Sequence, residues 1–113
     1  QTEPILKFGR MYFRKTSKKA VDFHYPNCEE CLLAFSRILH NGEILVVYNS
    51  SPKDAKEEYV LIDATINKAG GQMKCIYGGK TKIKVQKNSD RQDSRLYIKL
   101  KLKPMEFLIF KNS

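Results

Sequence analysis

The residues of this chain best suited to hold a metal ion or to do redox chemistry are found among its three cysteines and two histidines. Cys28 and Cys31 form a Cys-x-x-Cys motif, and His24 lies four residues before it. A structural zinc site needs four ligands with paired spacing, so this set is incomplete unless Cys75 joins from a distant segment. A redox Cys-x-x-Cys needs a helix N-terminus that lowers the thiol pKa, whereas this motif precedes an expected strand. We therefore expect no metal and no cofactor, with two loop thiols and a buried Cys75.

The cysteine count also bears on the compartment. An odd number of cysteines argues against a complete disulfide framework, and unpaired thiols favour a reducing compartment such as the cytoplasm. No charged segment followed by an apolar run opens the sequence, so no signal peptide is visible. No apolar run approaches the roughly 18–20 residues that cross a bilayer, so we expect no membrane partner.

Catalytic motifs are missing from the sequence. It contains no G-x-S-x-G, no H-E-x-x-H and no glycine-rich phosphate loop. Asp22 and Asp63 are carboxylates that would act as a glycosidase pair only if they converged about 5–10 Å apart across a cleft. Nothing in their spacing argues for such convergence, so we expect solvated side chains.

The positive charge is concentrated in the last third. The chain carries 21 Lys+Arg against 12 Asp+Glu, a net charge of +9, and ten basic but only three acidic residues lie in 80–113. Such an excess suggests a polyanion such as nucleic acid. In 82–85 and 96–103, however, lysines alternate with apolar residues, which predicts strands with one solvated face. Tyr97 alone is no stacking platform, so a nucleic-acid partner is the least favoured hypothesis.

Short strands separated by turns account for most of the chain. The strands that we expect cover 32–39, 44–48, 59–66, 73–77, 82–85, 96–103 and 105–110. The aromatic-rich segment 4–14, which lacks clean periodicity, is a candidate for an eighth. Asn41-Gly42 between two apolar runs is a strong hairpin signal, and the continuous β-branched run 44–48 suits a strand covered on both faces. Pro104 separates the last two strands. Turn signals about every 8–12 residues predict an all-β fold, an antiparallel Greek-key β-sandwich of seven to eight strands.

Three segments, in this order, resemble one known family. Residues 5–14 (ILKFGRMYFR) are similar to the stretch that leaves the catalytic barrel of α-amylase-superfamily enzymes. Residues 33–49 (LAFSRILHNGEILVVYN) resemble a hairpin of their C-terminal domain, and residues 102–107 (LKPMEF) resemble its last strand. Together the three segments span nearly the whole chain. The sequence thus resembles the C-terminal all-β domain of glycoside hydrolase family 13.

This resemblance implies a division of the chain and a role for it. Residues 1–15 would be the segment leaving a (β/α)8 barrel, packed on the sandwich, and residues 16–113 the C-terminal β-sandwich domain. The family's catalytic carboxylates lie on the barrel, which this sequence does not contain, so no catalytic residue carries over. The chain would be a noncatalytic domain that stabilises and shields the barrel of a larger enzyme acting on α-glucosidic bonds. The implied barrel contacts are Ile5, Leu6, Phe8, Tyr12 and Phe13.

Two alternatives remain open at this stage. In the first, the domain is a carbohydrate-binding platform for an α-glucan, on which exposed aromatic rings stack; the candidates are Tyr25, Tyr59, Tyr77 and Tyr97. In the second, less favoured, the domain is a basic nucleic-acid-binding β-domain. The lysine-rich last third and the Cys28–Cys31 motif lie outside the segments that carry the resemblance.

Overall fold

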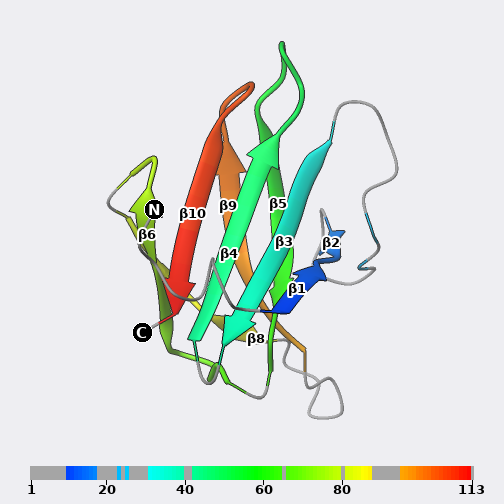
Figure 1. Cartoon of the computed structure of the whole chain (residues 1–113). Helices are drawn as coiled ribbons and strands as arrows, with labels where there is room; N and C mark the ends of the chain where they lie inside the picture. The colour runs from blue at the N-terminus through cyan, green and yellow to red at the C-terminus, as the bar shows by residue number, and fades with distance from the viewer. Residues whose placement is uncertain are drawn as a thin grey trace.

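Two antiparallel sheets make up the part of the chain that the structure describes (Figure 1). The computed structural model describes residues 10–17, 23, 25, 31–39, 42–64, 66–79, 81–87 and 95–112. The six-stranded sheet has the order β1 (Arg10–Phe13), β3 (Leu32–Leu39), β4 (Gly42–Asn49), β10 (Phe107–Asn112), β6 (Gln72–Tyr77) and β7 (Lys82–Lys84). The four-stranded sheet has the order β2 (Thr16–Ser17), β5 (Lys56–Ile62), β9 (Leu96–Leu102) and β8 (Gln86–Lys87). The expected all-β antiparallel sandwich is confirmed.

The chain crosses between the sheets in an interlocked, Greek-key manner. β4 and β10 are neighbours in the six-stranded sheet, while β5 and β9 are neighbours in the other. The β4–β5 connection and the β9–β10 connection therefore cross between the sheets beside each other, with β3, β4 and β10 in front of β5 and β9 in Figure 1. The last strand thus lies between β4 and β6, two strands that are distant from it in sequence.

The core lies between the sheets and follows the period-two pattern of the strands. In β9 the alternate residues Leu96, Ile98, Leu100 and Leu102 are buried, and they pack with Leu45 and Val47 of β4 and Phe110 of β10. The lysines between them, Lys99 and Lys101, are exposed. The expected alternation of apolar and solvated faces in this strand is confirmed.

One expected strand ends earlier than its pattern suggests. Apolar alternation continues to Ile66, but β5 ends at Ile62. The cause is Asp63, whose Oδ1 accepts the Ile66 N–H at 3.1 Å and so closes a turn. Asp63 is half-buried and organises backbone, so the expectation of a freely solvated carboxylate is wrong. β2 and β8, which are the two strands added to the expected set, have two residues each and are too short to leave a pattern.

Asn49, at the end of β4, ties the two crossing connections together. Its side chain is fully buried, and its Nδ2 donates to the carbonyls of Asp54 at 2.8 Å, Lys103 at 3.1 Å and Leu102 at 3.3 Å. Its Oδ1 accepts the Ser51 N–H at 3.0 Å. One amide side chain thus satisfies backbone groups from both connections, which buried polar groups require.

Candidate functional site

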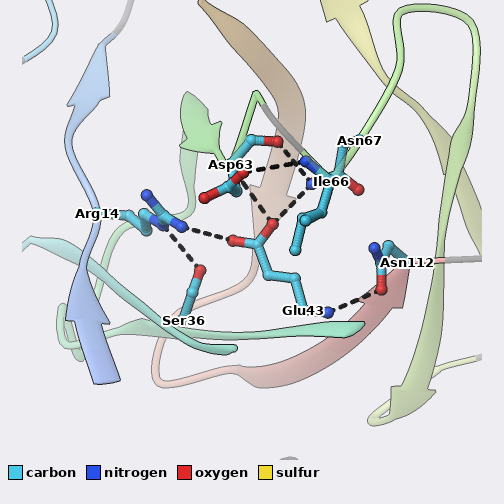
Figure 2. A network of polar contacts seen from close by, with 7 residues as sticks. All are labelled: Arg14, Ser36, Glu43, Asp63, Ile66, Asn67 and Asn112. Atoms are coloured by element: carbon cyan, nitrogen blue, oxygen red, sulfur yellow. Dashed lines mark hydrogen bonds and ion pairs between the residues drawn. The ribbon is translucent and has the colours of Figure 1, made fainter. Parts of the chain in front are cut away.

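A buried acidic residue lies at the centre of a polar network between the sheets (Figure 2). Glu43 is 0% exposed. Its Oε2 accepts from the Arg14 guanidinium at 2.9 Å, and its Oε1 accepts from Asn67 Nδ2 at 2.7 Å and from the Asp63 N–H at 3.1 Å. Arg14 Nε also donates to Ser36 Oγ at 2.9 Å.

This network draws on the start of the chain, the β3–β4 hairpin and the turn after β5. Both carboxylate oxygens of Glu43 accept hydrogen bonds. Among the described residues, no buried side-chain nitrogen or oxygen lacks a hydrogen-bond partner. Glu43 is also 0% exposed, so neither of its carboxylate oxygens faces solvent, from which a substrate would arrive. The geometry therefore supports a positioning role in the fold, not acid–base chemistry.

Glu43 is not predicted as a site residue by the sequence, because an acid beside the Asn41-Gly42 turn is typical of an exposed turn. The available signal was its place directly before the continuous apolar run 44–48. Burial of an acid at that place implies a paired cation.

The outer face of the six-stranded sheet carries a second apolar cluster. In register, Phe13, Phe35, Val46, Ile109 and Tyr77 form one row across β1, β3, β4, β10 and β6. Leu33, Tyr48 and Phe107 form the next row. Ile44 of β4 lies on the same face, on the other side of the first row. We call the two rows together with Ile44 the apolar outer face. Their neighbours in β3, β4 and β10 point into the core, among them Ala34, Leu45 and Phe110, so this face looks away from the other sheet.

The apolar outer face is buried at its centre and exposed at its rim. Ile44, Val46 and Ile109, in the centre, are 0%, 5% and 8% exposed, with Phe35 packed against them. At the rim, Phe13 is 67% exposed and Tyr77 57% exposed, and Leu33 and Phe107 are also exposed. The continuous burial of β4 confirms the expected strand that is covered on both faces.

Rim side chains contact one another rather than standing singly. The Phe13 and Phe35 rings pack edge-on with centroids 6.4 Å apart, and those of Tyr77 and Phe107 lie 5.7 Å apart. Gly78, at φ +91°, follows Tyr77, and a Cβ there would come within 2.7 Å of the Phe107 carbonyl oxygen. This close approach holds the end of β6 against β10 and so fixes Tyr77 beside Phe107.

The predicted barrel contacts fall mostly outside the described residues. Ile5, Leu6 and Phe8 lie outside the described part of the chain. Tyr12 pairs with Ser36 of β3. Phe13 is therefore the one whose side chain the structure places, at the exposed rim of the apolar outer face.

The four predicted stacking tyrosines do not form one platform. Tyr25 and Tyr77 are exposed, Tyr59 is half-buried, and Tyr97 is 6% exposed. The expectation that Tyr97 is exposed is wrong, because the rings of Phe23 and Tyr59 lie 5.7 Å and 5.2 Å from its ring. Arg95 lies over Phe23 and Lys99 over Tyr59, so cations border this aromatic cluster on the four-stranded sheet.

Cys31 departs from its expected state. It is buried and disulfide-bonded, so the description of Cys31 as a loop thiol is wrong. Its carbonyl accepts the Ser50 N–H at 2.9 Å, and its N–H donates to Ser50 Oγ, which anchors it to the end of β4. Cys75 is a free, buried thiol, as expected. The argument for a reducing compartment loses its premise, because it relied on unpaired thiols.

The other predicted metal ligands, Cys28 and His24, lie outside the described residues. Within the described ranges, no group of three or more His, Cys, Asp or Glu side chains could hold a metal ion. The described segments also contain no helix of the length and hydrophobicity needed to span a membrane.

Comparison with known proteins finds no relative for this chain. No protein-family model matches it. No curated protein matches it, and no solved structure does. The two-sheet all-β fold is therefore established by the structure alone.

Proposed function

We propose that this chain is the noncatalytic C-terminal β-sandwich domain of an α-amylase-like glycosidase or transglycosidase, and that it stabilises and shields the catalytic barrel. The observation that carries the proposal is the apolar outer face, with its exposed aromatic rim. A contiguous apolar patch on a soluble domain usually marks an interface. The similarity of segments 5–14, 33–49 and 102–107 to that family supplies the identity of the partner.

The docking energy comes from the rim. Burying an exposed Phe, Leu or Tyr side chain contributes roughly 1.5–3 kcal/mol relative to leaving it in water. Phe13, Leu33, Tyr77 and Phe107 together are enough for a stable contact between domains of one chain, which needs no loss of translational freedom. The barrel would then cover the six-stranded sheet as a third layer, and this chain would bring none of the reacting groups.

The alternatives have weaker support. A carbohydrate platform retains Tyr25 and Tyr77 as exposed tyrosines, but Tyr25 lies by Lys15, whose ammonium is 5.2 Å from its ring, away from Tyr77 on β6. A nucleic-acid surface built on Tyr97 has no exposed ring there, because the Tyr97 ring is buried between the rings of Phe23 and Tyr59. The exposed aromatics instead gather on the face that docking would use.

The preceding part of the encoded chain tests the proposal. We expect a (β/α)8 barrel with a pair of catalytic carboxylates immediately before Gln1. We also expect the longer chain to cleave or transfer α-glucosides, while the 113-residue chain does neither under the same conditions. A coding sequence without a barrel before Gln1 contradicts the proposal.

A further inference from the structure

The outer face of the six-stranded sheet also carries a row of cations. In register, Lys111 of β10, Lys74 of β6 and Lys82 of β7 lie side by side. Ile44 of β4 joins this row to Arg37 of β3. We call Arg37, Lys111, Lys74 and Lys82 the cation row. Neighbouring strands lie about 4.8 Å apart, so the three lysines follow one another closely, and none of these register positions holds an acidic residue.

The cation row points the same way as the apolar outer face. Met73 and Cys75, on either side of Lys74 in β6, are buried in the core, so Lys74 points away from the core. Phe110, which precedes Lys111 in β10, also lies in the core. The cation row and the apolar outer face are therefore parts of one surface.

The cation row lies directly beside the row of residues that contains Tyr77. Tyr77 pairs with Ile109, which is two residues before Lys111 in β10, and two residues span about 7 Å along a strand. Lys74 and Lys82 are exposed. A partner that covers the Tyr77 ring therefore also reaches the cation row, and covering an ammonium group is costly unless an acid faces it.

Protection of the sheet edge does not account for this row. Lysines on an edge strand discourage pairing with another sheet, and this reason suffices for Lys82 and Lys84 on β7, the last strand of the six-stranded sheet. Lys74 and Lys111 lie on β6 and β10, each of which has a neighbouring strand on both sides. Their charges therefore face whatever covers the sheet, not a strand that would extend it.

We propose that the protein surface docked on the apolar outer face is acidic where it meets the cation row, so that its carboxylates pair with Lys74 and Lys82. This inference rests on the proposed function, since it describes the side of the barrel domain that contacts this sheet. The net charge of +9 favours an acidic partner surface. Apolar contacts are not directional, whereas charge pairs fix the register of a contact, so the cation row orients the docked domain.

Lysine acetylation tests the contact in the 113-residue chain and in the longer chain that includes the preceding residues. Lys74 and Lys82 should react several-fold more slowly in the longer chain, while Lys99 and Lys101, on the other sheet, should react equally in both. Hydroxyl-radical labelling of Tyr77 in the same samples reports docking itself. A protected Tyr77 with unprotected Lys74 and Lys82 overturns the acidic contact and leaves docking intact, whereas an unprotected Tyr77 contradicts the proposed function as well.

Two matched variants of the longer chain separate charge from simple coverage. Lys74→Gln with Lys82→Gln removes two charges from the cation row, and Lys99→Gln with Lys101→Gln removes two from the other sheet. The first should lower the protection of Tyr77 by about two- to thirtyfold, as expected for the loss of two exposed ion pairs, and added salt should weaken the wild-type protection. The second should leave Tyr77 as in the wild type. Equal effects of the two variants, or protection that salt does not change, overturn the acidic contact.

A nucleic acid is the competing occupant, because exposed rings beside cations also suit single strands. The probe is a single-stranded oligothymidylate, titrated into the 113-residue chain at physiological salt. We expect no binding that depends on Lys74 and Lys82. Binding that is lost in Lys74→Gln with Lys82→Gln, but kept in Lys99→Gln with Lys101→Gln, would overturn an acidic protein surface as the occupant.

Discussion

Replacing Glu43 with glutamine is expected to lower the free energy of unfolding by about 3–5 kcal/mol, a cost of the size found when one partner of a buried ion pair is removed. The value should fall toward the lower end, because the Arg14 side chain is 16% exposed. Both oxygens of Glu43 accept from donors, so the amide nitrogen of Glu43→Gln faces a donor in either orientation. Urea unfolding of the two proteins measures the difference.

The chain supplies a matched control for this substitution. Glu57 pairs with Lys99 at 3.7 Å, and both side chains are about half exposed. Exposed pairs of this kind are worth about 0–1 kcal/mol, so Glu57→Gln should shift the unfolding midpoint little. A double variant, Glu43→Leu with Arg14→Met, should recover part of the loss, because an apolar pair leaves no buried charge. Equal effects at Glu43 and Glu57 would contradict the structural role of the network.

Asn49→Asp is expected to destabilise the fold by about 3 kcal/mol or more at neutral pH, since each buried group left without a partner costs about 1–3 kcal/mol. The wild-type amide donates to the carbonyls of Asp54, Leu102 and Lys103. A carboxylate donates nothing and repels all three oxygens. The expected order of stability at neutral pH is wild type, then Asn49→Ala, then Asn49→Asp.

Acidification separates charge from shape at this position. The new carboxyl in Asn49→Asp is buried among carbonyl oxygens, so its pKa in the folded state rises above that in the unfolded chain. Stability of this variant is therefore regained as the pH falls through the raised pKa and lost as the pH rises. The gap between Asn49→Asp and Asn49→Ala should narrow at low pH in thermal unfolding. A gap that stays constant with pH would show that charge plays no part.

The fold was predictable wherever residues alternate over a whole strand. In β9 four buried apolar residues alternate with exposed lysines, apart from Tyr97, and the assignment of β9 was correct. β5 shows the limit, because Ala64 and Ile66 continue the alternation while the Asp63 side chain closes a turn that ends the strand. Periodicity reports the average environment of a segment and is blind to a single side-chain–backbone hydrogen bond.

The site residues depended on contacts that are distant in sequence. In the alternating pattern of β9, Tyr97 shares a face with Lys99 and Lys101, which predicts a solvated ring. Phe23, more than 70 residues earlier in the sequence, packs against that ring instead. Glu43 is buried because Arg14 and Asn67 meet it from two other segments. Phe13 was predicted as a barrel contact only through a resemblance, whereas the apolar outer face follows from the register of five strands.

Hydroxyl-radical labelling of the outer face tests the docking role most directly. Phe13 and Tyr77 should be labelled readily in the 113-residue chain, where both rings are exposed. In the longer chain that includes the preceding residues, both should be protected several-fold. Tyr25, which is as exposed as Tyr77 but lies by Lys15, serves as the control and should react equally in both chains. Equal labelling of Phe13 and Tyr77 in the two chains would contradict docking through this face.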